Sequence, residues 1–182
     1  MKNRTQTDTI VVHCSATPAS MDIGAELIRE WHLARDWDDI GYAAVIRRDG
    51  RIEFGRPFHA IGAHVAGHNG HTVGVCLIGG LDANMQPEDN FTAEQFISLR
   101  LLIQMLMKAY PGSTVMGHRD FPAVNKDCPC FDAGAWWDSL DAPIAAYASV
   151  TATVCPLYDD KDGIASGGRG TELLYGETVR IL

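Results

Sequence analysis

Segments with the spacing of β-strands and of α-helices alternate along most of this chain, and the alternation limits the folds that it can adopt. Thr9–Cys14 (TIVVHC) and Thr72–Ile78 (TVGVCLI) are short runs of β-branched and other apolar residues, which predict buried strands. Between them, apolar residues recur at helical spacing from Ile23 to Arg35, with Asp22 as the predicted N-cap. We therefore expect an α/β fold in which helices pack on a central sheet.

The middle of the chain predicts a β-hairpin. Tyr42–Arg48 and Arg51–Phe54 have the composition of strands, and the Asp49–Gly50 pair between them is typical of a tight turn. One more strand is expected at Ser113–His118 (STVMGH). The predicted sheet thus contains one hairpin among strands that helices separate.

Two further helices are predicted near the middle and towards the end of this α/β region. Phe91–Tyr110 is the clearest, because Thr92 and Gln95 form a capping box and Pro111 ends the helical pattern. Ala133–Leu140 predicts a short helix that carries two neighbouring tryptophans. Both helices are expected to cover the sheet.

Composition narrows the classes of function. The chain has 182 residues, which suits one domain with a small appendage. Its formal net charge is −8 and it has no long basic run, so binding to nucleic acid or to an anionic membrane is not expected as its main function. No segment reaches the roughly 18 apolar residues of a membrane span. Met1–Ile10 lacks the apolar stretch of a signal peptide, so we expect synthesis in the cytoplasm, and we expect a monomer.

The five cysteines indicate metal ligation or burial, because an odd, scattered set argues against a disulfide framework. Cys14 adjoins His13 on a strand, so the two side chains point to opposite faces and cannot hold the same ion. Cys14 is therefore predicted to lie in the core. Cys76 lies within an apolar run and is predicted to be buried as well.

Two histidines lie at predicted strand ends, where open α/β sheets place their sites. His13 is at the end of the first strand, and His118 closes the last one. Either alone is best explained as a satisfied polar group, but a nearby thiolate changes that interpretation. Catalytic zinc takes three protein ligands, imidazole and thiolate among them, and keeps a fourth position open. The spacing alone does not decide whether Cys128 or Cys130 supplies the thiolate.

Other polar residues lie close to these candidates in the sequence. Lys126 could stabilise an oxyanion beside a metal, or be an ordinary solvated lysine. Tyr42 could donate a hydrogen bond to a substrate carbonyl, or be an ordinary strand aromatic. The segment His59–Gly74 (HAIGAHVAGHNGHTVG) carries four histidines among small residues. It predicts a loop lining a groove, with His64 in contact with the ligand; the alternative is a solvated loop.

Several motifs, in order along the chain, resemble the zinc N-acetylmuramoyl-L-alanine amidases. They are IVVHCSATPAS, REWH, GYAAVIRRDGRIEFGR, HVAG, TVGVCLIGGLD, NFTAEQFISLRLLI and KDCPCFD, followed by WW. The branch is that of phage endolysins of the T7 lysozyme type, which are related to bacterial amidases and peptidoglycan recognition proteins. The resemblance covers roughly Asp8 to Leu140.

The resemblance implies a mixed, mainly parallel sheet with helices on both faces and Zn²⁺ in a peptidoglycan-binding groove. The matching motifs place the zinc ligands at His13, His118 and Cys128, which selects the first cysteine of the CPC segment. They place the catalytic tyrosine and lysine of the family at Tyr42 and Lys126. The implied reaction is hydrolysis of the amide between N-acetylmuramic acid and L-alanine in peptidoglycan. A phage protein of this kind would reach the cell wall with the help of a holin.

Three alternatives remain open at this stage. A peptidoglycan recognition module without activity typically lacks the cysteine ligand, so the presence of Cys128 favours an enzyme. A cytosolic recycling amidase would act on soluble muropeptides instead of whole walls. A structural zinc site would use Cys130 as a fourth ligand. The chain also departs from the family pattern at Cys130 and at Ala43–Ala44, where relatives have Gly or Ser and bulky residues, respectively.

The C-terminal residues differ in composition from the rest. Thr151–Leu182 is rich in Gly and Asp, with short β-like pieces, and lies outside the amidase resemblance. Its CPLYDD and TELLYGETVRIL segments resemble the opening strands of bacterial SH3-like wall-binding domains, at about half their length. We therefore expect an amidase domain at residues 1–150 and a β-like tail at 151–182, either a truncated wall-binding segment or a cover for the first domain.

Overall fold

The computed structural model describes residues 1–140, 147–149, 154–156, 172–174 and 178–180, and the chain divides into two compact units, Met1–Ala142 and Pro143–Leu182. In the described part of the first unit, the main sheet has five strands in the order β4-β3-β5-β1-β7. Their bounds are β1 Thr9–Cys14, β3 Ala44–Ile46, β4 Ile52–Phe54, β5 Thr72–Leu77 and β7 Thr114–Gly117. The strands β3, β5, β1 and β7 are parallel, and β4 pairs antiparallel with β3. The predicted mixed, mainly parallel α/β fold is confirmed.

The register of the sheet brings two predicted site residues to one edge. Val12 of β1 pairs with Gly117 of the neighbouring parallel strand β7. His13 and His118 are the next residues along these two strands. Because the carboxyl ends of parallel strands meet at the same edge, the two side chains are delivered to the same place.

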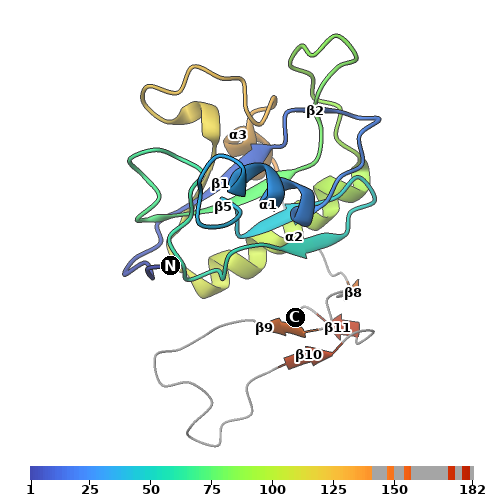
Figure 1. Cartoon of the computed structure of the whole chain (residues 1–182). Helices are drawn as coiled ribbons and strands as arrows, with labels where there is room; N and C mark the ends of the chain where they lie inside the picture. The colour runs from blue at the N-terminus through green and yellow to red at the C-terminus, as the bar shows by residue number, and fades with distance from the viewer. Residues whose placement is uncertain (141–146, 150–153, 157–171, 175–177, 181–182) are drawn as a thin grey trace, which may run out of the picture. The chain divides into compact units, whose positions relative to one another are not determined.

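Helices cover both faces of the sheet (Figure 1). The helix α2 (Ala93–Ala109) packs on one face, where Leu99 and Ile103 join Val75 in the main core. The helix α1 (Ala25–Leu33) packs on the other face, where Ala25 and Ile28 join Cys76 of β5. The alternation of side chains along β5 explains why one strand serves both cores. No helix in the described part of the chain is long and apolar enough to cross a bilayer.

The start of α1 differs from the prediction. The helix begins at Ala25, its N-cap is Gly24, and no side chain caps it there. The carboxylate of Glu53, from β4, accepts a hydrogen bond from the Ala25 N–H at 2.6 Å. The predicted cap, Asp22, instead pairs with Arg47 at 2.9 Å. The prediction was wrong because a distant strand supplies the acceptor that the first turn needs.

Two local predictions are confirmed. Thr92 and Gln95 form the reciprocal capping box of α2. The hairpin β3–β4 turns at Gly50, whose φ of +83° lies in the left-handed region that glycine adopts without strain. A third helix, α3 (Ala133–Asp138), also lies where a short helix was predicted.

The remaining strands are short. A two-stranded parallel ribbon joins β2 (Thr17–Pro18) and β6 (Gly80–Leu81). The described residues of the C-terminal unit form antiparallel pairs: β9 with β10 and β8 with β11. Their bounds are β8 Tyr147–Ser149, β9 Val154–Pro156, β10 Glu172–Leu174 and β11 Thr178–Arg180. The predicted likeness of the tail to an SH3-like domain concerns segments that lie largely outside the described residues.

Candidate metal centre

Three side chains from distant parts of the sequence converge at the carboxyl edge of the sheet. The ligand atoms of His13, His118 and Cys128 all lie within 4.8 Å of one another. His13 Nδ1 is 3.8 Å from Cys128 Sγ, and the rings of His13 and His118 are 4.6 Å apart between centroids. Two imidazoles and one thiol are a donor set that catalytic zinc sites use. The residues present therefore fit Zn²⁺.

Backbone contacts hold Cys128 at this edge. The Arg119 N–H donates to the carbonyl of Cys128 at 2.7 Å, and the Cys14 N–H donates to Cys128 Sγ at 3.3 Å. Gly117 permits the close approach of Pro129, because a Cβ at position 117 would lie 2.8 Å from Pro129 Cδ. The loop after β7 is thus folded back onto the strand ends.

The other cysteines have different surroundings. Cys130 Sγ donates to the Gly80 carbonyl at 3.0 Å and lies 3.9 Å from Cys14 Sγ. Cys130 is therefore outside the group of three ligand atoms, which weakens the alternative of a closed four-ligand site. Cys14 and Cys76 are buried, as predicted. The contact with Cys128 and burial raise the pKa of Cys14 to about 12.

Burial keeps both histidines of the cluster neutral. His13 is 1% exposed, and burial lowers its pKa well below the ordinary value, with the nearby His64, His118 and Lys126 adding to the effect. Burial and Lys126 also lower the pKa of His118. A neutral imidazole has a free lone pair, and that is the form that binds metals.

Tyr42 and Lys126 approach the centre from two sides. The Tyr42 ring lies 5.1 Å from the His13 ring between centroids. Burial raises the pKa of Tyr42 well above its usual value, and the neighbouring thiols of Cys76 and Cys128 contribute, so the phenol is protonated at neutral pH. Lys126 is exposed and belongs to the loop that carries Cys128. A hydrogen-bond donor and an exposed cation therefore lie near the candidate ligands.

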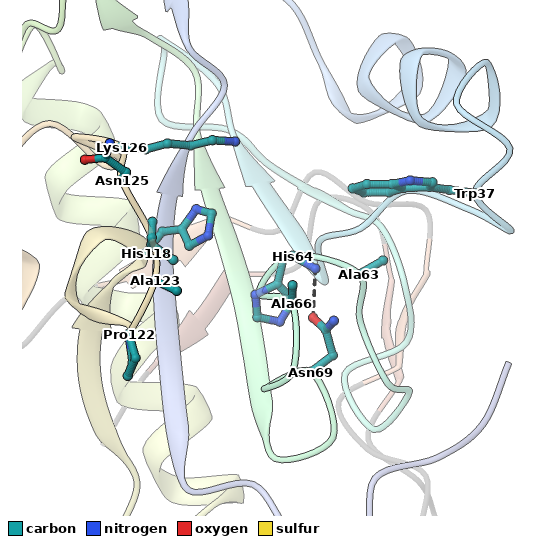
Figure 2. A pocket seen from close by; sticks show the side chains of 11 residues that line it. Trp37, Ala63, His64, Ala66, Asn69, His118, Pro122, Ala123, Asn125 and Lys126 are labelled. Carbon is teal, nitrogen blue, oxygen red and sulfur yellow. Dashed lines mark hydrogen bonds between the residues drawn. The ribbon is translucent and has the colours of Figure 1, made fainter.

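A pocket of about 530 Å³ adjoins the cluster, and His118 belongs to the lining of the pocket. Figure 2 shows His118 and Lys126 on one side of the pocket and Trp37 on the other, with His64 between them. Trp37 is 36% exposed, and its ring lies 4.4 Å from that of His32 between centroids. Sequence reasoning missed Trp37, since an aromatic just after a helix gives no sign that it faces a pocket.

His64 lines the pocket but is buried. Its Nδ1 lies 3.0 Å from His13 Nε2, and its Nε2 lies 3.4 Å from Thr72 Oγ1. Burial lowers the pKa of His64 to about 3, so the ring is neutral. Both ring nitrogens face protein atoms, whereas the sequence predicts a contact with substrate; that contact stays a prediction.

Comparison with known proteins gives the family of this chain. The family described as N-acetylmuramoyl-L-alanine amidase matches residues 3–131. The chain belongs to this family. The amidase is 49% identical over 135 residues to the endolysin of Klebsiella phage KP32, covering 74% of this chain and 88% of that protein. It is 43% identical over 137 residues to the endolysin of Escherichia phage T7, covering 75% and 89%.

The fold of the amidase also matches solved structures. The N-acetylmuramoyl-L-alanine amidase LysC from Clostridium intestinale superposes with a TM-score of 0.62 at 30% identity, covering 72% of this chain and 81% of that one. The predicted family, the predicted fold and the predicted enzyme class are confirmed.

Proposed function

We propose that this amidase cleaves the bond between N-acetylmuramic acid and L-alanine in peptidoglycan and acts as a phage-type endolysin. One observation carries the proposal: His13, His118 and Cys128 converge beside a pocket in a chain of the amidase family. The similarity to the endolysins supports the cell wall as the substrate.

We propose that His13, His118 and Cys128 hold Zn²⁺. The fit of the donor set and the neutral state of both imidazoles support this assignment. When bound, Zn²⁺ would supply a Lewis acid that polarises the scissile carbonyl and makes water more acidic.

Lys126 and Tyr42 are the proposed catalytic residues. Lys126 lines the pocket next to His118, so its ammonium can donate to the oxyanion that forms when the amide carbonyl is attacked. Tyr42 stays protonated, so its phenol can donate to the substrate carbonyl or orient the attacking water. Each residue acts on charge that develops in the transition state.

We also propose the wider setting. The enzyme is made in the cytoplasm, acts as a monomer, and reaches the wall after release, assisted by a holin if a phage encodes it. Residues 1–150 form the catalytic domain, and residues 151–182 form a tail that assists binding to the wall or covers the domain. The chain divides into compact units after Ala142, which is earlier than the boundary proposed here.

Product analysis on purified peptidoglycan tests the reaction. The zinc-loaded enzyme should release stem peptides with a free N-terminal L-alanine and leave the glycan strands intact, as read by mass spectrometry. Cleaved glycan strands, or peptides cut at another bond, would contradict the proposed reaction. Turnover of soluble muropeptides without release from intact sacculi would favour the recycling amidase. Binding to sacculi without any product would favour the recognition module.

A further inference from the structure

His13 uses its two ring nitrogens in different directions. Its Nδ1 faces Cys128 Sγ at 3.8 Å, on the side of the candidate metal centre. Its Nε2 lies 3.0 Å from His64 Nδ1, on the side of the protein interior. The hydrogen bond at Nε2 therefore decides whether Nδ1 carries a proton or a lone pair.

The hydrogen bonds beyond His64 determine which atom donates at each step from His13 through His64 to Thr72. The Thr72 hydroxyl donates its single hydrogen to the carbonyl of His68 at 2.9 Å. Thr72 Oγ1 can then only accept from His64 Nε2, 3.4 Å away. A neutral His64 with its proton on Nε2 has a lone pair on Nδ1, and this lone pair accepts the Nε2–H of His13. The remaining lone pair of His13 is on Nδ1, towards Cys128.

Two glycines, Gly62 and Gly74, leave the space that the His64 ring occupies. A Cβ at Gly74 would lie 2.7 Å from His64 Cγ, and a Cβ at Gly62 would lie 2.5 Å from His64 Cδ2. Gly74 is a residue of β5, and its partner in β1 is Val11, on the same face as His13. Two residues with side chains would exclude the ring from its place against His13.

The backbone at His64 is fixed as well. Asn69 Oδ1 accepts hydrogen bonds from the N–H groups of His64 and Val65 at 2.8 and 2.9 Å, and Figure 2 draws the first of them. The loop is thus tied to itself directly at the residue that contacts His13. Position, rotation and proton direction of the His64 ring are all determined by neighbouring groups.

We propose that His64 is a positioning residue that selects the tautomer and orientation of His13 for metal binding through Nδ1. Partners of this kind typically change metal affinity by about 10- to 100-fold when they are removed. The inference rests on the metal site proposed above. It gives His64 a role through His13, in place of the predicted contact with substrate.

Zinc affinity measured by competition with a chromophoric chelator tests this role. His64→Leu removes the acceptor, and its zinc affinity should fall about 10- to 100-fold below that of the wild type. His64→Asn places Oδ1 where Nδ1 was, and its affinity should stay within about threefold of the wild type. Val65→Ala is the control: it removes buried methyl groups from the same loop without touching the hydrogen bond to His13, so its affinity should be unchanged.

The outcomes distinguish a failure of the proposed metal site from a failure of the proposed role of His64. Wild-type protein that binds no zinc would overturn the metal site itself. Wild-type affinity in His64→Leu, or equal losses in His64→Asn, His64→Leu and Val65→Ala, would overturn the role of His64 while leaving the metal site intact.

A spectroscopic measurement on the wild type keeps the proposal testable if a variant does not fold. In zinc-loaded full-length protein with ¹⁵N-labelled histidine, two-bond ¹H–¹⁵N correlation should show His13 protonated at Nε2 and metal-bound at Nδ1. It should show His64 with its proton on Nε2. Metal binding through Nε2 of His13, or a proton on Nδ1 of His64, would overturn the assignment.

Discussion

Two loops that line the same pocket treat their polar side chains in opposite ways. The ligand loop, Gly117–Phe131, carries Cys128 and Lys126. Its backbone is bonded to itself, and Cys128 Sγ accepts from the Cys14 N–H of β1. The histidine loop, His59–His71, turns the side chains of His64 and Asn69 inward. We propose that residues of the ligand loop bind a metal or substrate and that residues of the histidine loop support them.

In these two loops, the partner of each side chain, and not its residue type, determines what the side chain can do. His118 and His64 are both histidines on the pocket wall. The first converges with two other ligand atoms, whereas both ring nitrogens of the second already face protein atoms. Changes in the ligand loop should therefore act on chemistry, and changes in the histidine loop should act first on geometry and stability.

The strongest loss of activity is expected at the two residues that we propose act on the scissile amide. Lys126→Ala and Tyr42→Phe should each lower kcat on peptidoglycan by about 10²-fold or more, the scale of losing one donor to an oxyanion. Both variants should keep wild-type zinc affinity, because neither residue belongs to the ligand cluster. Steady-state rates and elemental analysis of the same samples measure the two properties.

Asn125→Ala provides the matched control for Lys126→Ala. Asn125 is a neighbouring, exposed residue of the same loop and also lines the pocket, but it carries no charge. It should lose at most a fewfold in kcat. Equal losses in the two variants would mean that the shape of the loop matters, and that the ammonium group has no specific role.

A smaller effect is expected in the histidine loop. Asn69→Ala removes the acceptor for two backbone N–H groups, so the free energy of unfolding should fall by about 1–3 kcal/mol. Asn69→Asp retains an acceptor oxygen and should lose less. Urea denaturation of the three proteins measures this. If Asn69→Ala were as stable as the wild type, the loop would not be held by this side chain.

The start of α1 and the residues that line the pocket are features that the sequence pattern did not predict. The meeting of His13 with His118 was implied by the resemblance to the amidases and is set by the parallel register. The strands and the capping box of α2 follow from periodicity. The cap of α1 does not, because the acceptor comes from Glu53 on another strand. Residue spacing also leaves Cys128 and Cys130 equivalent, since it does not give the direction of either side chain.

The hydrogen bond from His64 to the candidate ligand His13 could not be predicted from the sequence either. The bond between His64 and His13 joins residues that are far apart in the chain and depends on a slot formed by glycines. A glycine within the apolar run of β5 was the only local sign that another group approaches the strand there. Trp37 faces the pocket because of the path of the chain after α1, which no local pattern encodes.

A still smaller effect is expected from His32, a buried histidine outside the ligand cluster: it should make the free energy of unfolding depend on pH. The Gly41 N–H donates to His32 Nδ1 at 2.9 Å, and burial, with Arg35 and Arg56 nearby, lowers the pKa of His32 below 6.5. Below pH 6.5 the unfolded chain takes up this proton before the folded chain does, so stability falls as the pH falls. This group contributes at most about 1.4 kcal/mol per pH unit.

His32→Asn isolates that contribution, because Asn can still accept from the Gly41 N–H but does not titrate. Unfolding free energies of the wild type and of the variant should be compared from pH 7 to pH 5. The wild type should lose stability more steeply. Parallel curves would mean that His32 takes up its proton equally in both states.

The smallest effect is expected from removing the tail, since both loops precede it. A chain that ends at Val150 should keep zinc and cleave soluble muropeptides at a near-normal rate. A chain that ends at Ala142, the end of the first compact unit, is the matched comparison. The chain that ends at Val150 keeps β8 but lacks its partner β11, whereas the chain that ends at Ala142 lacks both strands. Loss of zinc in both chains would show that the tail belongs to the catalytic domain.

Metal content in two cysteine variants tests the proposed ligand set. Wild-type protein and Cys130→Ser should each hold one zinc per chain by elemental analysis, because Cys130 lies outside the three-atom cluster. Cys128→Ser should hold none at the same protein concentration and should release no stem peptides. Full zinc in Cys128→Ser, or an empty site in Cys130→Ser alone, would contradict the account.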